Sequence, residues 1–455
     1  MSAAPIPPVE WMPSPQKQQS VARPAGETNV DELGRAILAE HCFARDGGGR
    51  LFVFIGGVYR PSGDLVIRQR VKGLMTGWGI QEKWSSRKAT EVVEYIRVDC
   101  PELWSDLPVN TINVLNGLLD VTTRKLRLHD PAFLSSVQLP ITYDSDARCD
   151  FWDKFISEVF PGDSEAIAWE IPAWLMTPEN SIQKAVLLLG EGSNGKSAYL
   201  QACVAFVGRH NTAALSLHKI EQDKFAAARL MGKLANICPD LPTAHLSSTS
   251  MFKALTGGDV LSAEFKFRDS FEYTPFCKLV FSANKPPQSD DATHGFFRRW
   301  QVIPFLRCFE DDAVGTSRRE DLDARLAAPA ELSGVLNKAL VALAQIRKVG
   351  FTQADSMRQA WDDFRTATDP LSVWLDQNTV ELPNAMVAMG DLMVSFNKHL
   401  LAAGKSPMTK MAFGLALKRA RKGIDKDQRT LRGRVQWVYI GIGLRASESE
   451  GGWDA

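Results

Sequence analysis

The chain has 455 residues, 45% of them hydrophobic, and its 53 basic side chains balance 53 acidic ones. This length predicts about three domains of roughly 150 residues each, and a net charge of zero neither indicates nor excludes a nucleic-acid partner. The seven cysteines stand singly without a CxxC pair, which argues against a zinc ribbon or a disulfide framework. Because no apolar run approaches about 20 residues and the N-terminus lacks a secretory pattern, we expect a soluble cytoplasmic protein.

The first half of the chain predicts a tail, a mixed domain and a helical bundle. Residues 1–29 hold six prolines among small and polar residues, which predicts a flexible tail. Residues 30–148 show helical spacing and then aromatic and β-branched runs around Gly56-Gly57, so we expect a small mixed α/β domain with a hairpin. Residues 149–184 have helical periodicity with a break at Pro161-Gly162, which we interpret as a helical collar that supports oligomerisation.

The second half predicts an α/β core followed by a smaller C-terminal domain. From 185 to about 305 buried strands alternate with helices, and a long apolar helix closes this domain near residue 355. Residues 356–445 begin with helices and end in a β-ribbon, an order that looks like a winged helix. Residues 446–455 form a short polar tail.

A glycine-rich turn follows the first strand of the core. The segment "GEGSNGKS" matches GxxxxGK[ST] at every defined position, with "AVLLL" before it and a helical pattern after it. Such a turn aims backbone N–H groups at phosphates, its lysine reaches the β- and γ-phosphates, and its hydroxyl binds Mg²⁺. We therefore predict an ATP and Mg²⁺ site. The residues expected to hold the nucleotide are Gly190, Gly192, Ser193, Asn194, Gly195, Lys196 and Ser197.

Two later strands each end in a polar side chain. Asp240 follows the buried strand "KLANIC", where a carboxylate can hold Mg²⁺ through water, although an Asp before a turn is often only a turn residue. Asn284 follows "CKLVFSA", where an amide can orient the attacking water or the phosphate, or can simply cap the loop. Given the glycine-rich turn upstream, we favour metal coordination by Asp240 and count it among the catalytic residues.

Two cationic segments stand among aromatic residues. "AEFKFRDSFEY" reads as a hairpin with Lys266, Phe267 and Arg268 near its tip, which is the combination of charge and ring that a single strand needs. "GFFRRWQVIPF" places Arg298 and Arg299 before an apolar strand, where they either form structural ion pairs or reach a nucleotide of a neighbouring subunit.

The order of these motifs resembles superfamily III helicases, specifically the helicase portion of phage, plasmid and poxvirus primase-helicases. "GEGSNGKS" is similar to their Walker A motif, "LANICPDLP" to Walker B, and "KALTGGDVLSAEFKF" to the motif peculiar to this superfamily. "LVFSANKPP" resembles the sensor-1 strand and "FFRRWQVIPF" the arginine-finger segment. The resemblance runs from about residue 30 to the C-terminus and is strongest over 185–305.

This resemblance implies an AAA+-like core that assembles as a hexameric ring around single-stranded DNA and translocates 3′ to 5′. It places Lys266 and Phe267 on a hairpin lining the pore and makes Arg299 the first choice for the arginine finger, with Arg298 second. Asp240 follows Pro239 rather than a second carboxylate, so the group that activates water stays open. With no polymerase acid triad and no His-hydrophobe-His nickase motif, we expect a helicase without a primase domain.

The C-terminal domain concentrates positive charge. From 405 to 434 ten basic residues accompany two acidic ones, a net charge of +8, which indicates a footprint for phosphates or, alternatively, a solvated helix face. The residues expected to contact DNA here are Lys418, Arg419, Arg421 and Lys422.

Two functions share all of these motifs. The first, which we favour, is a replicative ring motor of a phage, plasmid or other mobile element in a bacterial host, acting on single-stranded and forked DNA with a separate primase or polymerase. The second is an origin-binding initiator or loader that uses ATP only to assemble. A kinase is disfavoured because the sequence offers no acceptor site or lid.

Overall fold

The computed structural model describes residues 29–242, 246, 248–267, 269–287, 289, 291, 293–309, 316–404, 406–421, 423–431 and 433–445, with only the backbone for 316–320 and 419. The chain divides into two compact units. The first consists of Met1–Leu103 with Pro131–Ser136, and the second of Trp104–Asp130 with Val137–Ala455. Of the predicted tails, residues 1–28 and 446–455 lie outside the described residues, and Asn29 is the N-cap of the first helix.

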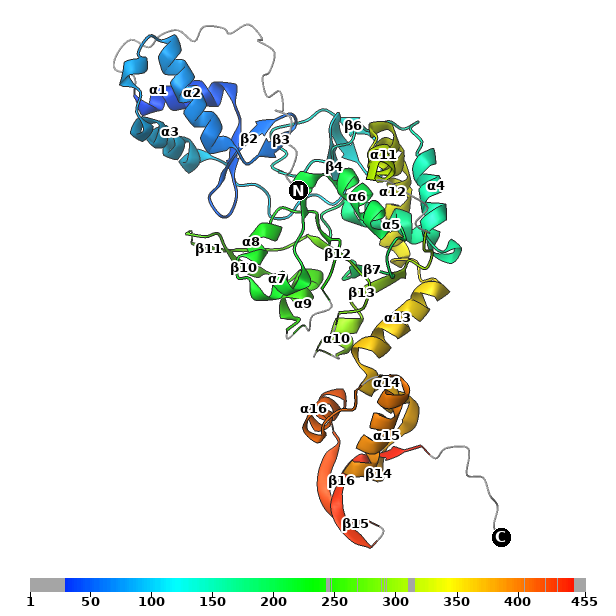
Figure 1. Ribbon diagram of the computed structural model, residues 1–455. Coiled ribbons are helices and arrows are strands. Elements are labelled where there is room, and N and C mark those ends of the chain that lie inside the picture. Colours follow the sequence, from blue (N-terminus) through cyan, green and yellow to red (C-terminus); the bar gives the residue numbers. More distant parts are fainter. Residues whose placement is uncertain are drawn as a thin grey trace. The chain divides into compact units, whose positions relative to one another are not determined.

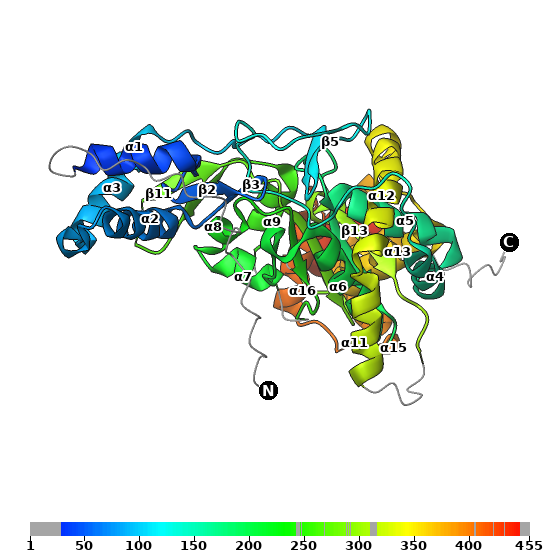
Figure 2. The ribbon, with the colours of Figure 1, turned by 90° about the horizontal axis from the view of Figure 1, so that it is seen from above.

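The first unit packs three helices beside a small antiparallel sheet of order β1-β2-β3 (Figures 1 and 2). Its predicted hairpin is confirmed, because Ile55 of β2 faces Val58 of β3 across Gly56 and Gly57. Both glycines have positive φ, as a two-residue hairpin turn of the primed type requires. The elements are α1 (Val30–Glu40), β1 (Phe43–Arg45), β2 (Leu51–Ile55), β3 (Val58–Arg60), α2 (Gly63–Gly77), η1 (Gln81–Lys83) and α3 (Ser86–Asp99).

The second unit begins with a three-stranded antiparallel meander, β4-β5-β6, followed by two helices. The sequence pattern assigns residues 104–148 to the N-terminal domain, but most of them cluster with the second unit. The physical reason is burial, since Ile112 and Leu119 of the meander share one apolar cluster with Trp152 and Val186. These elements are β4 (Thr111–Val114), β5 (Gly117–Asp120), β6 (Leu126–Arg127), α4 (Asp150–Val159), η2 (Gly162–Ser164) and α5 (Glu165–Leu175).

A five-stranded parallel sheet forms the centre of this unit, in the order β13-β7-β12-β9-β8. Its strands are β7 (Ala185–Leu189), β8 (Thr212–Ala213), β9 (Ala235–Cys238), β12 (Lys278–Ala283) and β13 (Trp300–Pro304). They are apolar along most of their length because helices cover a parallel sheet on both faces. Since all five strands run the same way, their carboxyl ends meet at one edge, the carboxyl edge, and their amino ends at the opposite amino edge.

The remaining elements of this core surround the sheet and extend from it. The helices are α6 (Lys196–Val207), η3 (Arg209–Asn211), α7 (Leu217–Gln222), α8 (Ala226–Leu230), α9 (Ser250–Gly257), α10 (His294–Phe297), α11 (Thr316–Leu326) and α12 (Pro329–Val349). The predicted hairpin at 263–273 is confirmed as the antiparallel pair β10 (Leu261–Glu264) and β11 (Ser270–Tyr273), whose first strand begins two residues earlier.

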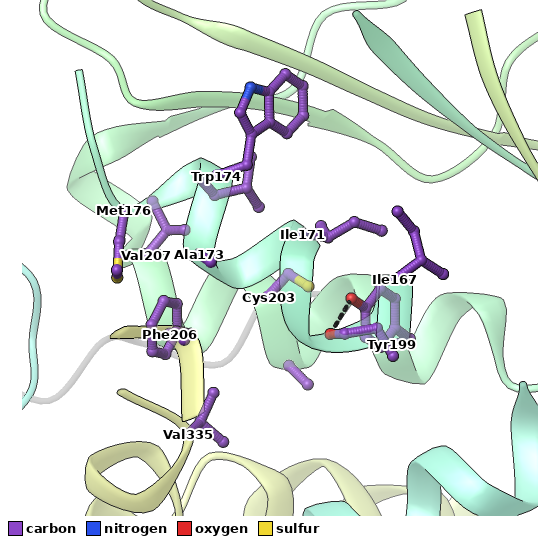
Figure 3. Packing of buried hydrophobic residues seen from close by; sticks show 14 of the residues in the cluster. Ile167, Ile171, Ala173, Trp174, Met176, Tyr199, Cys203, Phe206, Val207 and Val335 are labelled. Atoms are coloured by element: carbon purple, nitrogen blue, oxygen red, sulfur yellow. Dashed lines mark hydrogen bonds between the residues drawn. The ribbon is translucent and has the colours of Figure 1, made fainter. Parts of the chain in front are cut away.

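Helices α5, α6 and α12 pack together behind the glycine-rich turn, as Figure 3 shows with Ile171, Phe206 and Val335. Within α5, Pro172 has no N–H to donate to the carbonyl of Ala168, four residues earlier. The hydroxyl of Tyr199 on α6 donates to that carbonyl at 2.8 Å instead, the dashed line in Figure 3. Both groups are buried, so the tyrosine supplies the hydrogen bond that the proline removes and joins α6 to α5.

The C-terminal part contains helices and a three-stranded antiparallel sheet of order β14-β16-β15. The predicted helices and ribbon are present, but residues Thr379–Ala388, in the part of the chain where helices were expected, form strand β14. Pairing of Val387 with Tyr439 explains the difference, because a long-range partner overrides the local helical pattern. The elements are α13 (Asp355–Thr368), α14 (Pro370–Asn378), β14 (Thr379–Ala388), α15 (Met389–Ala402), α16 (Lys410–Ala420), β15 (Asp425–Leu431) and β16 (Arg434–Leu444).

Among the described residues, no helix has both the length and the apolar character needed to cross a lipid bilayer.

Replacement of Tyr199 by Phe leaves the Ala168 carbonyl buried without a donor. We expect this change to lower the free energy of unfolding by about 1–3 kcal/mol, measured by denaturant unfolding. In a Pro172→Ala background the restored N–H can donate to the same carbonyl, so Tyr199→Phe should cost clearly less there. Equal costs in the two backgrounds would contradict this account of the contact.

Candidate functional site

The glycine-rich turn connects β7 to α6 at the carboxyl edge of the sheet. Gly192, Ser193 and Gly195 all have positive φ, at +115°, +44° and +85°, so the backbone curves sharply within the turn. A Cβ at position 195 would lie 2.6 Å from Cγ1 of Val159, so the turn packs directly against α4. Only glycine satisfies both the backbone conformation and this contact at 195.

The backbone N–H groups of the turn are available to a ligand. Within the part of the chain that the structure describes, none of the N–H groups from residues 191 to 198 has a protein acceptor. They include the first N–H groups of α6, where the helix dipole favours negative charge. The exposed hydroxyl of Ser197 lies beside them in the first turn of α6. A row of unused donors at a helix N-terminus fits a polyphosphate.

Lys196 is nearly buried, with its ammonium held inside the turn. Its Nζ donates to the Gly190 carbonyl at 2.5 Å and to Oδ1 of Asn194 at 3.1 Å, and burial lowers the pKa of this lysine. Asn194 in turn donates from Nδ2 to the Phe305 carbonyl at 3.3 Å. A phosphate is a stronger acceptor for an ammonium than a neutral carbonyl, so Lys196 is placed to exchange these partners for an anion.

The structure brings Asp240 and Asn284 to the same edge as the turn. Leu189 pairs with Ala283 in the neighbouring strand β12, so Asn284 stands level with Gly190. Beyond the end of β9, the N–H of Leu241 donates to the Ser282 carbonyl at 2.8 Å, which fixes the exposed Asp240 one strand further along. No cluster of three or more potential metal-ligating His, Cys, Asp or Glu side chains occurs among the described residues.

The β10–β11 hairpin presents Lys266 and Phe267 at its tip. The Phe267 side chain is 93% exposed at a backbone φ of +64°, and Nζ of Lys266 lies 4.9 Å from its ring centre. The hairpin is anchored to α8 by the Tyr273 hydroxyl, which donates to the Ala227 carbonyl at 2.6 Å. Arg268, predicted for the same tip, lies outside the described residues.

Arg298 and Arg299 lie at the amino edge, because they immediately precede β13. The exposed guanidinium of Arg298 donates to Oε1 of Gln183 at 3.3 and 3.4 Å. Arg299 is less exposed and turns inward, donating to the Gly295 carbonyl at 2.5 Å. The geometry therefore favours Arg298 over Arg299 as the side chain that reaches outward, the reverse of the order that the sequence resemblance implies.

Two lysines join the arginines at this edge. Lys184 donates to the Arg298 carbonyl at 2.7 Å, and its pKa is lowered by burial and then by the charge of Arg298. Burial also lowers the pKa of Lys278 to about 7 and, together with Arg298, that of Arg299. None of these four cations forms an ion pair with a described carboxylate. Lys278 is buried and donates to the Thr177 carbonyl. The positive charge that an anion can reach at this edge is therefore that of the exposed Arg298 with Lys184 beside it.

The predicted DNA-contacting residues of the C-terminal part have different surroundings. Lys418 is exposed on α16. Arg421 is only 14% exposed and forms ion pairs with Asp376 at 2.5 Å and with Glu381, which indicates a structural contact rather than one to a phosphate. The side chain of Arg419 and all of Lys422 lie outside the described residues.

Sequence reasoning missed three residues that shape these sites: Val159, Gln183 and Phe305. Val159 limits position 195 to glycine, Gln183 orients Arg298, and the Phe305 carbonyl fixes Asn194. Each acts from an element distant in sequence, so no local spacing identifies it. Of the three, only Phe305 could have been found from the sequence. It ends the predicted strand "QVIPF", and functional groups of a parallel sheet gather where its strands end.

Two stretches of the chain match known families. Residues 188–299 match a family of unknown function, DUF5906, and residues 36–161 match a family described as D5 N terminal like. The first begins at the end of β7, just before the glycine-rich turn, and ends at Arg299, just before β13. Each match covers less than half of the chain.

Curated relatives include two viral proteins named as helicases. "Putative helicase L207/L206" of Acanthamoeba polyphaga mimivirus is 28% identical over 145 residues, 30% of this chain and 15% of that protein. "Putative helicase 121R" of Invertebrate iridescent virus 3 is 26% identical over 235 residues, 48% of this chain and 25% of that protein. The chain thus spans a quarter or less of the length of these two relatives, and over the matched stretches it is similar to proteins named as helicases.

A solved structure shares the fold. The apo C-terminal region of NrS-1 aligns with 92% of this chain and 100% of its own chain, at a TM-score of 0.50 and 11% sequence identity. At such low identity the likeness concerns the mixed α/β fold alone.

Replacement of Lys196 by Ala removes a charged donor from the turn, whereas Lys184→Ala removes a lysine from the opposite end of the same strand. We expect the first change to weaken binding of a fluorescent ATP analogue by about 10–100-fold. The second should leave binding to dilute, unassembled protein unchanged. Equal losses would mean that the triphosphate does not bind at the carboxyl edge.

Proposed function

We propose that the chain is an ATP-dependent DNA helicase of a phage, plasmid or other mobile element. It acts as a ring, hexameric by its resemblance to superfamily III, of AAA+-like subunits that move 3′ to 5′ on single-stranded DNA. The observation that carries this proposal is the separation of two complementary sites on one sheet. Unused N–H donors and Lys196 gather at the carboxyl edge, and unpaired cations gather at the amino edge.

The residues at the carboxyl edge divide the work on ATP. The turn holds the polyphosphate, Ser197 and Asp240 bind Mg²⁺, and Asn284 orients the attacking water. ATP supplies the phosphoryl group whose hydrolysis releases free energy. Asp240 is the only one of these side chains with a carboxylate, so it is the candidate both to position the metal and to accept the proton of the water. A second protein carboxylate is absent from the described stretch at the end of β9.

The cations at the amino edge cannot serve the nucleotide of their own subunit. Ala185, whose N–H donates to the Arg299 carbonyl, lies five residues before Gly190, where the turn begins. At about 3.3 Å per residue this separation is about 16 Å, which exceeds the reach of an arginine side chain. In a ring of head-to-tail contacts, the amino edge of one subunit can meet the carboxyl edge of the next. The unpaired charge is then neutralised by the γ-phosphate of the neighbour.

The hairpin tip supplies the contact to DNA. Lys266 offers a charge for a phosphate, and the exposed ring of Phe267 offers a surface for a base or sugar. The positive φ of Phe267 is a strained backbone conformation for a non-glycine residue, and such strain clusters at functional sites, which supports a functional role. The names of the viral relatives support the same class of activity.

Strand displacement on a 3′-tailed duplex, with ATP hydrolysis measured in parallel, tests this function. Lys266→Ala should retain basal hydrolysis but lose displacement and stimulation by single-stranded DNA. Lys348→Ala, the same change on the exposed end of α12, is the matched control. It should retain basal hydrolysis, strand displacement and stimulation by single-stranded DNA. Hydrolysis by the unaltered protein without any displacement would instead support an initiator that uses ATP to assemble.

The two arginines should differ in effect. Arg298→Ala is expected to lower the hydrolysis rate by about 10³–10⁵, and Arg299→Ala by less, because Arg299 donates to its own Gly295 carbonyl. Mixing Arg298→Ala subunits with Lys196→Ala subunits should restore part of the activity, since some interfaces then combine an intact turn with an intact arginine. A mixture that stays as inactive as its components would exclude a contribution from the neighbouring subunit.

A further inference from the structure

The β15–β16 ribbon carries an exposed aromatic face that the motor does not use. Strand β14 pairs with β16 only from Val438 onward, so residues 434–437 pair with β15 alone and form a two-stranded extension. In Figure 1 this part of the ribbon extends past helices α14 and α15. An extension of this kind is solvated on both faces, and its exposed side chains are therefore not explained by a local core.

Strand alternation separates the side chains of the ribbon by chemistry. Gln428 lies opposite Trp437 and Thr430 opposite Val435, while Lys426 lies opposite Tyr439 and diagonal to Trp437, so these side chains share one face. Asp425 and Asp427 alternate with them and point to the other face, where Asp427 pairs with Arg429 at 2.9 Å. The Trp437 face therefore holds a cation and no carboxylate among the described residues of the ribbon.

The apolar groups of this face are exposed to solvent. Val435 is 71% exposed and Trp437 is 46% exposed, and Nζ of Lys426 lies 4.7 Å from the centre of the Trp437 ring. The pair has the same composition as Lys266 and Phe267 at the tip of the other hairpin, with a lysine over an exposed ring.

We propose that the Trp437 face of the ribbon binds single-stranded DNA, with a base stacked on Trp437 and the Lys426 ammonium paired with a phosphate. A base stacked on an indole contributes more than a cation over an exposed ring, so an incoming base displaces the lysine. The displaced ammonium is then free to bind the backbone of the same strand. Charge complementarity selects the occupant, because this face offers a cation with no competing carboxylate.

Helix α16 is a weaker surface for the same strand. The side chains exposed along it include Met411 and Leu415, 77% and 59% exposed, with Lys418 on the following turn. Arg421 beyond its end is already paired with Asp376 and Glu381. The ribbon, rather than the helix, therefore combines an exposed ring with an available cation. This site does not depend on the proposed function, because it needs neither ATP nor a ring.

Fluorescence anisotropy of a labelled oligothymidine, titrated with the full chain without nucleotide over a salt series, tests the site. The protein carries Lys266→Ala throughout, so that the other hairpin contributes no lysine. Trp437→Ala should weaken binding about tenfold without changing the salt dependence. Lys426→Gln should reduce the slope of log affinity against log salt by about 0.7, the value for one phosphate on a single strand. Lys348→Gln, the same change on the exposed end of α12, should leave both quantities unchanged.

Two further comparisons keep the test independent of folding and of the motor. Trp437→Phe retains a stacking ring and should restore most of the affinity that Trp437→Ala loses. If the indole had only a structural role, the affinity would not depend on whether the replacing side chain can stack on a base. Trp437→Ala should change the affinity for a duplex of equal length only slightly, because the bases of a duplex are not free to stack on a side chain. The proposal is overturned if Lys426→Gln leaves the salt slope unchanged, or if Trp437→Ala binds the oligothymidine normally.

Discussion

The pairing of β7 with a parallel strand on each side is the constraint on which the rest of the structure depends. Beyond the regular pairs, the N–H of Gly190 bonds the Ala283 carbonyl at 3.2 Å and the N–H of Phe305 bonds the Leu189 carbonyl at 2.7 Å. These two bonds hold the start of the glycine-rich turn between its neighbours. They also set the level at which Asn284 and the Phe305 carbonyl stand beside it, so the positions of the polar groups follow from backbone pairing rather than from contacts among themselves.

Buried polar side chains reinforce this arrangement at two places. Tyr199 replaces the donor that Pro172 lacks, and its satisfied hydroxyl connects the helix after the turn to the helix behind it. Asn194 links the turn to the edge strand β13 and the turn to its own lysine. Leaving such a group unpaired costs more than the bond itself contributes, so these contacts act mainly by excluding other arrangements.

The sequence contained the individual parts of the site but little of their arrangement. Glycine and lysine spacing located the turn, and apolar runs located β7, β9 and β12 because a fully buried strand is legible in its own residues. Strand order is different, since nothing in "KLVFSA" states that it lies between β7 and β9. For the same reason the sequence does not show that Arg421 is paired. Its carboxylate partners, Glu381 and Asp376, lie 40 and 45 residues earlier in the sequence. Strand β14 was not predicted because its pairing partner, β16, lies about 50 residues away in the sequence.

The length of strand β13 is constrained, because groups at both of its ends have fixed positions. Arg298 and Arg299 precede its first residue, and the carbonyl that fixes Asn194 belongs to the residue after its last. Deleting one residue would shorten the strand by about 3.3 Å and turn every following side chain to the opposite face. The arginines could then stay in place only if Phe305 moved away from the turn, or the reverse. An edge strand would ordinarily tolerate insertions and deletions, but this one is a spacer of fixed length whose two ends must both be in register.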